Sequence, residues 1–461
     1  MWLLEDGVAG FGGFGRAAFI GALGVLALAG CGSRSKGPTP QQACFVGVYR
    51  LADGRSLDVA PSEGSDLRWR LLDGGVGRLS AKEGWASTLG WTGRPDGVQV
   101  GFEGCGEGAR VTFAERGAPR LTGARLKLET HDTTFKSGDV VLKGRLVLPA
   151  GTGKVPVLVE VHGSEKDSAV VFNWRQRLFP AEGVGVFVYD KRGTGGSTGK
   201  YTQDFKVLAA DAAAAAREAR RLAGAGLGRL GFEGGSQGGW IAPLAATMTR
   251  VDFVIVGYGL ADSPFAENRD EALQDVERFG PAIAPKAREA IAATEAVMAS
   301  NFRSGFDQVA RVKAKYGKEP WFKSLKGEFT GDILKYPGWG LRIVGPWFDE
   351  GTPWTYDPIP VLRRLDTPLL WVLAGDDTSA PLKETRRRLM TLRVEGRPIT
   401  VLEYPRTEHG ILEYEEGPDG KRLETGYGEG WLQTSIDWAR DGRLRDAAYG
   451  SGILLTPAAE A

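Results

Sequence analysis

From about residue 129 onward, short apolar runs alternate with segments of helical length. Each run is rich in Val, Leu and Phe and is bounded by polar or glycine-containing stretches, which is typical of a strand buried on both faces. Strands alternating with helices, such as the alanine-rich segment 208–222, predict an α/β domain over 129–445 with a mostly parallel sheet and helices on both faces. The runs expected as strands are 138–149, 155–161, 184–189, 227–232, 251–256, 369–373 and 400–404.

Residues 42–128 follow a different pattern. Short β-type runs such as 67–72 are separated by Asp-Gly pairs that begin at positions 53, 73 and 96. Regular turn signals between short strands predict a small all-β domain. No group of catalytic residue types stands out in this segment, so we expect a structural or substrate-positioning role for it.

The alternation is interrupted between residues 256 and 369. Helical segments are expected at 271–279 and 286–302, followed by a proline-spaced stretch that contains four tryptophans. An insertion at this point would lie over the carboxyl ends of the strands, where ligands bind in open α/β sheets, so we expect a helical cap over about 260–360. The alternative is that the tryptophans only fill a small helical core. They are Trp321, Trp339, Trp347 and Trp354.

The first 30 residues are typical of an export signal. Arg16 precedes an apolar run over 17–29, which is shorter than the roughly 20 residues that a membrane span needs. Leu28-Ala29-Gly30-Cys31 resembles the bacterial lipobox, in which the cysteine becomes the lipidated first residue of the mature protein. Gly32 instead of aspartate follows Cys31, which implies an exported lipoprotein on the periplasmic side of the outer membrane. The alternative is an ordinary signal peptide with a chance cysteine.

The segments before and after this signal, and the end of the chain, are more polar. The leading segment is long for an export signal and contains Glu5 and Asp6, which suggests that the true start codon lies further along. Residues 31–41, rich in Ser, Gly, Pro and Gln, predict a short linker, and 446–461 a C-terminal tail.

The cysteine content predicts one disulfide, and the net charge limits the kinds of partner that we expect. After Cys31 the chain has only Cys44 and Cys105, and two such cysteines in an oxidising compartment more often pair than stay free, so we expect a Cys44–Cys105 disulfide. Because 58 basic residues balance 57 acidic ones, nothing in the charge favours nucleic acid as a partner. The expected partners are a small-molecule ester or peptide and, through the lipid anchor alone, a membrane; the sequence leaves the oligomeric state open.

A possible nucleophile stands at a strand–turn–helix junction. Ser236 lies in Gly234-Gly235-Ser236-Gln237-Gly238, after an apolar run and before a helix-like stretch, which is the context of a nucleophile elbow. A second match to the same spacing, centred on Ser197, lies in a polar loop with no helix directly behind it. Ser236 is therefore the candidate nucleophile.

The general base follows by elimination among three histidines. In an alternating α/β fold with a nucleophile elbow, the order along the chain is Ser, then acid, then His. His131 and His162 precede Ser236, and only His409 follows it, so His409 is the candidate base. His162 ends a buried strand and is interpreted as structural.

The candidate acid and the oxyanion donors come from loops at strand ends. The run 369–373 leads into Asp376-Asp377, and Asp377 is preferred as the acid, with Asp376 as the alternative that would serve the turn. One oxyanion N–H is expected from Gln237, directly after the nucleophile, and the other from Ser164 in the loop after 155–161.

Taken in order, these motifs resemble the α/β-hydrolase superfamily, in its bacterial esterase and prolyl-oligopeptidase-like branch. The resemblance covers about 130–445 and departs from the family at 375–377, where many members have one more residue before the acid. It implies that the Asp-x-Arg-Gly-x-Gly-x-Ser loop shapes the rim of the site without doing chemistry. The matching segments are 162–164, 189–197, 234–238, 375–381 and 409–410.

The leading hypothesis is therefore a serine hydrolase of carboxylic esters that acts through Ser236, His409 and Asp377. A peptidase of the prolyl-oligopeptidase-like class is the alternative, although a β-module of this size cannot form a propeller. The third hypothesis is a cell-envelope lipoprotein without catalytic activity. Scattered histidines disfavour a metal site, and no phosphate-binding loop of the Walker type is present, so no cofactor is expected.

Overall fold

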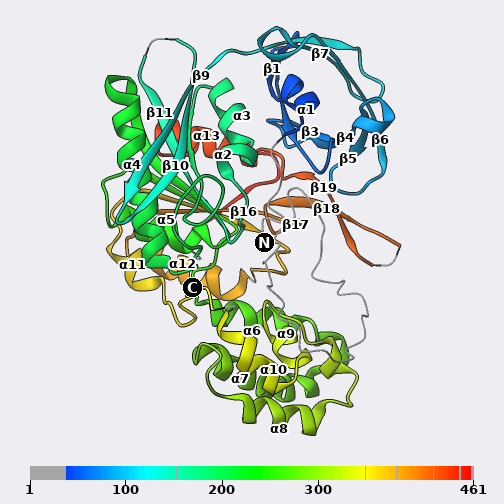
Figure 1. The fold of residues 1–461 in the computed structure, drawn as a ribbon, viewed down its shortest axis with the longest axis vertical. Coiled ribbons are helices and arrows are strands. Elements are labelled where there is room, and N and C mark those ends of the chain that lie inside the picture. The colour runs from blue at the N-terminus through cyan, green and yellow to red at the C-terminus, as the bar shows by residue number, and fades with distance from the viewer. Residues whose placement is uncertain are drawn as a thin grey trace, which may run out of the picture.

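The computed structural model describes residues 38–151, 153–347, 349–380, 382–418, 420–445 and 448–457. The expected signal segment and Cys31 lie outside these residues. Figure 1 shows three parts: a small β-barrel, a central sheet covered by helices, and a group of helices at the opposite end from the barrel. No helix in the described ranges has the length and apolar character needed to cross a membrane.

The N-terminal part is a closed, antiparallel barrel of eight strands. Its core contains Tyr49, Trp69 and Phe113, and a Cys44–Cys105 disulfide ties the first helix to the loop after β6, as expected from the sequence. The elements are α1 (Pro40–Phe45), β1 (Gly47–Leu51), β2 (Ser56–Pro61), β3 (Leu67–Leu71), β4 (Val76–Ser80), η2 (Ala81–Glu83), β5 (Ala86–Leu89), β6 (Pro95–Glu103), η3 (Gly106–Gly108), β7 (Arg110–Ala114) and β8 (Leu121–Arg125).

Two of the three Asp-Gly pairs form turns, and the third does not. Gly54 and Gly74 have positive φ angles of 91° and 107° between consecutive strands. Asp96-Gly97 instead lies inside β6, where the pairing with β5 shifts register between Ala86 and Thr88. Gly97, with φ 80°, therefore serves a bulge and not a turn.

The central sheet has nine strands in the order β20-β16-β15-β14-β13-β11-β12-β10-β9. Six neighbouring strands from β16 to β12 are parallel, and antiparallel strands lie at both edges. The strands are β9 (Leu128–Ser137), β10 (Val140–Pro149), β11 (Val155–Val161), β12 (Gly185–Tyr189), β13 (Leu227–Gly235), β14 (Phe253–Gly257), β15 (Leu369–Ala374), β16 (Ile399–Tyr404) and β20 (Ile453–Leu455). β20 falls within the segment expected as a C-terminal tail.

Helices cover both faces of this sheet, as the alternating pattern predicts. On one face, α4 packs its alanines against the strands and begins at Asp204, whose side chain accepts from the N–H groups of Lys206 and Val207. The helices of this face are α4 (Phe205–Ala223), η4 (Gly224–Gly226), α5 (Gly238–Ala246), α11 (Ile359–Arg364) and α12 (Leu382–Val394). Those of the other face are α2 (Ala169–Phe172), α3 (Arg175–Ala181) and α13 (Trp431–Asp441).

The segment between β14 and β15 contains a group of helices with its own apolar core. We call the helices from α6 to η8 the helical insertion. Trp321 is buried in its core, and Trp354 stacks on Phe265. The elements are α6 (Pro264–Gln274), η5 (Glu277–Phe279), η6 (Pro281–Ile283), α7 (Ala284–Ala299), α8 (Phe306–Tyr316), η7 (Trp321–Ser324), α9 (Thr330–Lys335), α10 (Gly338–Val344) and η8 (Gly345–Trp347).

A three-stranded sheet follows β16 and contacts the barrel. It consists of β17 (Thr407–Glu408), β18 (Leu412–Glu416) and β19 (Arg422–Tyr427). The backbone N–H of Tyr427 donates to the carbonyl of Gly74 at 2.9 Å, and the Tyr427 ring packs edge-on against Trp91. The first and last parts of the chain are therefore joined directly, as the proximity of orange and blue ribbons in Figure 1 also shows.

Candidate active site

Ser236 lies at the sharp turn between β13 and α5. Its φ angle is 53°, in the left-handed region that non-glycine residues rarely adopt. A Cβ atom at Gly234 would come within 2.3 Å of the Gly238 carbonyl oxygen, and one at Gly238 within 2.4 Å of the Val161 carbonyl oxygen. Glycine is therefore required on both sides of the turn, which explains the spacing seen in the sequence.

His409 and Asp377 form a buried pair. The imidazole Nδ1 of His409 lies 2.9 Å from Asp377 Oδ2 and 3.1 Å from Oδ1. Asp377 Oδ1 also accepts from the N–H groups of Ser379 and Ala380, at 2.9 and 2.7 Å. These donors fix the carboxylate, and the carboxylate in turn orients the ring.

Asp376 points elsewhere. Its Oδ2 accepts from the Tyr414 hydroxyl at 2.6 Å, and its backbone N–H donates to Thr407. Of the two neighbouring carboxylates that the sequence offered, the structure brings only Asp377 to His409.

The other imidazole nitrogen, His409 Nε2, is buried and has no hydrogen-bond partner among the described residues. Tyr258 lies against the same imidazole, with ring centroids 4.8 Å apart and an edge-on angle of 73°. A Cβ atom at Gly235, next to Ser236, would come within 2.2 Å of the Tyr258 hydroxyl oxygen. Tyr258 thus bridges the Ser236 turn and the His409 ring. Sequence reasoning missed it, although its position directly after β14 was a usable signal.

The loop after β11 is pressed against the start of α5. A Cβ atom at Gly238 would also come 3.1 Å from the His162 carbonyl oxygen. The carbonyls of Gly163 and Ser164 accept from Lys191 Nζ and the Tyr201 hydroxyl, both at 2.7 Å. The structure therefore places the Ser164 loop beside the first residues of α5, next to Gln237.

A buried charged group supports this loop. His162 Nδ1 lies 2.8 Å from Glu165 Oε1, and its Nε2 donates to the Tyr189 carbonyl. Burial acts to raise the pKa of Glu165, but Lys191 and the His162 hydrogen bond outweigh it and lower that pKa to about 2. Burial in turn lowers the pKa of Lys191. Both ring nitrogens of His162 are occupied, in agreement with its structural interpretation.

The two remaining sequence candidates are engaged elsewhere. The Ser197 hydroxyl donates to the Asp190 carbonyl at 2.7 Å and accepts from the Lys143 N–H at 2.9 Å. His131 is on β9, where its Nε2 contacts Glu129 at 2.7 Å. Neither residue contacts the Ser236 turn in these interactions.

Two carboxylates of α6 lie in the electrostatic field of Asp377. Glu267 and Glu271 are four residues apart and therefore share one face of the helix. Burial raises the pKa of Glu267 well above its ordinary value, and Glu328 and Asp377 raise it further. Burial, Glu267 and Glu328 raise the pKa of Glu271 to about 10. The two α6 carboxyls therefore lie close enough to the His409–Asp377 pair to feel its charge, and pKa values raised this far keep them protonated and uncharged at neutral pH.

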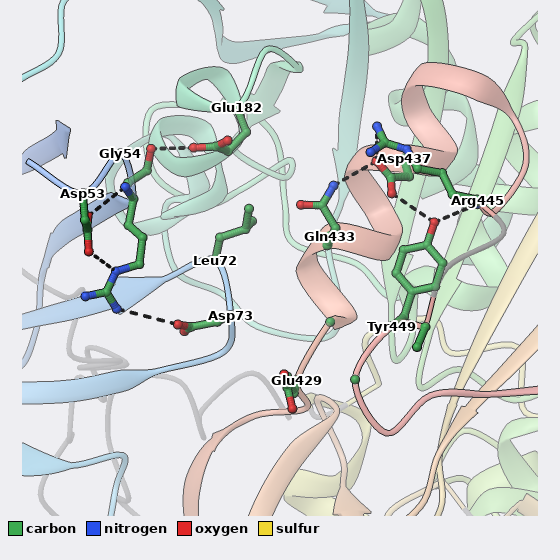
Figure 2. A pocket seen from close by; sticks show the side chains of 15 residues that line it. Asp53, Gly54, Leu72, Asp73, Glu182, Glu429, Gln433, Asp437, Arg445 and Tyr449 are labelled. Carbon is green, nitrogen blue, oxygen red and sulfur yellow. Dashed lines mark hydrogen bonds and ion pairs between the residues drawn. The ribbon is translucent and has the colours of Figure 1, made fainter. Parts of the chain in front are cut away.

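A cavity of about 620 Å³ lies between the barrel and α13 and contains none of the candidate residues. Figure 2 shows charged groups around it that pair with one another. Asp53 accepts from Arg55, and Asp437 accepts from Gln433 and the Tyr449 hydroxyl. These interactions line the boundary between two parts of the chain. Among the described residues, no group of three or more His, Cys, Asp or Glu is arranged to hold a metal ion.

Residues 137–263 match a protein-family model described as X-Pro dipeptidyl-peptidase (S15 family). No curated protein sequence matches the chain. Among solved structures, it is similar to Pyrococcus horikoshii acylaminoacyl peptidase, at 17% identity and a TM-score of 0.39 over 77% of this chain and 52% of that one, so the match spans about half of that peptidase.

Two esterases are similar over shorter parts of this chain. A Pyrococcus furiosus esterase has 16% identity and a TM-score of 0.38 over 61% of this chain and 84% of its own. A Pyrobaculum calidifontis esterase has 18% identity and a TM-score of 0.37 over 61% and 77%. The mostly parallel sheet, with Ser236 at a strained turn between a strand and a helix, has the α/β-hydrolase architecture expected from the sequence, and the segment that contains this turn is similar to the X-Pro dipeptidyl-peptidase (S15) family.

Proposed function

We propose that the protein is a serine hydrolase that cleaves carboxylic esters by acyl transfer. The observation that carries this proposal is the His409–Asp377 pair, whose imidazole has one nitrogen held by a buried carboxylate and the other unpaired. With Nδ1 donating to Asp377, Nε2 keeps the lone pair that a general base needs.

In the proposed mechanism, Ser236 Oγ attacks the ester carbonyl carbon while His409 Nε2 takes the hydroxyl proton. The backbone N–H groups of Gln237 and Ser164 stabilise the oxyanion. His409 then gives its proton to the departing alcohol, which leaves an acyl-enzyme. A water molecule, deprotonated by the same nitrogen, attacks the acyl carbon and releases the acid, and the proton returns to Ser236.

The helical insertion is proposed to act as a cap over this site. The support comes from α6, because its carboxyls Glu267 and Glu271 lie close enough to Asp377 for that charge to contribute to their raised pKa values. A cap that excludes water strengthens the electrostatic interactions inside the site.

A peptidase is the second candidate, and the same two carboxylates favour it. Burial and neighbouring carboxyls raise the pKa of Glu271 to about 10, and an ammonium group of a substrate at this place, such as a peptide N-terminus, would lower that pKa and pair with the carboxylate that forms. A neutral ester offers no such partner. The match to a dipeptidyl-peptidase family points in the same direction.

The test uses the chain from Gly32 onward, which contains every described residue. Hydrolysis of p-nitrophenyl acetate and butyrate is measured for this chain, Ser236→Ala and Ser197→Ala. We expect activity in the first and third and none in the second. Equal background rates in all three would overturn the serine esterase and leave the idle lipoprotein as the alternative.

The peptidase is tested with aminoacyl p-nitroanilides, with and without a blocked amine. Faster cleavage of the free-amine substrate, with a KM that rises at least tenfold in Glu267→Gln or Glu271→Gln, would establish it, since about tenfold is the effect expected for losing one ion pair worth ~1.4 kcal/mol. Unchanged KM in both variants would exclude recognition of an amine by α6.

We further propose that the protein is exported and lipidated at Cys31. The Cys44–Cys105 disulfide supports an oxidising compartment. Labelling with a radioactive fatty acid tests the anchor, and we expect the label in the wild type and none in Cys31→Ala. An unlabelled wild type would overturn it.

A further inference from the structure

Lys191, in the loop after β12, is a buried cation to which the proposed mechanism gives no role. Only 2% of the residue is exposed, and its Nζ donates to the Gly163 carbonyl at 2.7 Å. Removing an ammonium group from water costs free energy unless charged or polar partners compensate for the loss. The partners of Lys191 therefore indicate what its charge acts on.

The surroundings of the ammonium group compensate for its charge. Burial lowers the pKa of Lys191, and Glu165 acts against this effect. Glu165 has a pKa of about 2, so it is ionised at neutral pH and supplies the compensating negative charge. The Tyr201 ring covers the ammonium, with its centroid 5.2 Å from Nζ. The other charged groups in this field are Lys166, Asp167 and Glu350.

The carbonyl that Lys191 binds belongs to the same peptide group as the proposed oxyanion donor. The C=O of Gly163 and the N–H of Ser164 are the two polar ends of that group. In a trans peptide these ends point in opposite directions, and the described residues contain no cis peptide bond. With Lys191 at the carbonyl end, the N–H of Ser164 therefore points away from the ammonium.

The strand order shows on which side that N–H lies. β11, which leads into Gly163, has β12 on one side and β13 on the other. Lys191 comes just after β12, and Ser236 comes directly after β13. Because the Gly163 carbonyl is directed to the β12 side, the N–H of the same peptide is directed to the β13 side, where the Ser236 turn lies.

We propose that Lys191 is a positioning residue that fixes the Gly163–Ser164 peptide and strengthens its N–H as an oxyanion donor. This inference rests on the proposed serine hydrolase and adds to it a residue that acts through the peptide alone. A positive charge at the carbonyl end polarises the amide, so its N–H becomes a stronger donor. Because the peptide is held before the substrate binds, no reorganisation is needed when negative charge develops on the carbonyl oxygen.

The experiment compares two lysines that lie over the same tyrosine ring. Lys166 Nζ is 4.4 Å from the centroid of the Tyr201 ring, but its side chain is 59% exposed and pairs with Glu350. Hydrolysis of p-nitrophenyl acetate is measured for the chain from Gly32 and for Lys191→Met, Lys166→Met and Ser236→Ala. Circular dichroism checks that each is folded.

A double variant, Lys191→Met with Glu165→Gln, is measured as well. Removing the ammonium alone leaves the buried carboxylate of Glu165 without its counter-charge, which destabilises the fold. The double variant removes both charges, so a loss of activity that remains in it is due to the missing ammonium and not to an unpaired carboxylate.

We expect both Lys191 variants to lose about tenfold to a hundredfold in kcat with little change in KM, less than the roughly 10²–10³-fold loss for removing a whole oxyanion donor. Lys166→Met should keep the wild-type kcat. An unchanged kcat in the Lys191 variants, or an equal loss in Lys166→Met, would overturn this inference alone. Hydrolysis that survives in Ser236→Ala would overturn the proposed function on which it rests.

A second measurement uses folded protein with Lys191 intact and does not depend on activity. The carbonyl carbon of Gly163 is observed by NMR in protein labelled with ¹³C at glycine carbonyls and ¹⁵N at serine, and it is assigned by its loss in Ser164→Ala. Because burial lowers the pKa of Lys191 below its ordinary 10.5, we expect the resonance to shift between pH 7 and 10.5, in the wild type and in Lys166→Met. Burial raises the pKa of Tyr201, so its hydroxyl stays protonated. A resonance that does not shift would overturn the inference.

Discussion

Trp91 of the barrel donates its backbone N–H to the carbonyl oxygen of Glu424 in β19, at 3.0 Å. The β18–β19 hairpin that receives this bond begins three residues after His409. The hairpin also holds the acid loop, because Tyr414 donates to Asp376 and Arg422 to the Asp376 carbonyl. The barrel therefore supports the two loops that carry the proposed base and acid.

Trp91→Ala should lower kcat more than it raises KM. The substitution removes the edge-on contact with the Tyr427 ring, at 5.7 Å between centroids, and loosens the hairpin. Displacing a catalytic group by a fraction of an ångström reduces kcat by about tenfold or more. Trp339→Ala, which removes an exposed ring, is the matched control in ester hydrolysis. A Trp91→Ala variant that is folded and has wild-type kcat would show that the barrel does not position His409.

The substitutions Asp377→Asn and Asp376→Asn should show which of the two carboxylates acts as the acid of the proposed triad. We expect the first to reduce kcat by about 10⁴-fold, because an amide cannot hold the imidazole in the tautomer that the reaction needs. Asp376→Asn keeps the His409 contact and should retain most of the activity. Kinetics on p-nitrophenyl acetate decide the matter, and the reverse result would assign the acid to Asp376.

Gly234→Ala and Gly238→Ala should abolish activity and lower stability, because each Cβ would lie less than 2.5 Å from a backbone carbonyl oxygen. Gly84→Ala is the control, since Gly84 has a φ of 63° but nothing within 4 Å of its Cβ position. There the cost should be only the backbone strain of about 1–2 kcal/mol. Thermal unfolding and ester hydrolysis measure both effects. Wild-type behaviour of the elbow variants would mean that the turn can relax.

Glu165→Gln should change how stability depends on pH. Because the folded-state pKa of about 2 lies below the ordinary value of 4.5, ionised Glu165 stabilises the fold above pH 4.5, and this contribution is lost as the pH falls toward 2. The shift corresponds to about 3 kcal/mol at neutral pH. Urea unfolding between pH 7 and 2 should show the two proteins converging in acid, whereas the exposed-site variant Glu415→Gln should parallel the wild type. A constant difference across this range would contradict a role for the charge.

Local patterns in the sequence were sufficient for the sheet and much of the site. Apolar runs such as 155–161 and 369–373 coincide with β11 and β15, because a strand buried on both faces needs an unbroken apolar run. Asp377 and His409 were paired by chain order, and the structure places them in contact.

Features that depend on contacts between residues far apart in the sequence could not be predicted from local patterns. The hairpin of β18 and β19 has few apolar positions, and its packing partner, Trp91, is more than 300 residues away. Tyr258 directly follows β14, but its contacts with Gly235 and with His409, which is about 150 residues further along the chain, appear only in the fold. The aromatic spacing of the insertion could not separate Trp321, which is buried, from Trp347, which is exposed, because both have the same chemistry.

The contact between the barrel and the hairpin also has a consequence for the order in which the chain folds. A chain synthesised from its N-terminus can close the barrel, and form its disulfide, long before residues 412–427 exist. The hairpin then docks on a surface that is already folded, and the loops of Asp377 and His409 take their final positions last. We therefore expect activity only in a chain that extends through residues 412–427, so that a chain truncated before this segment is inert.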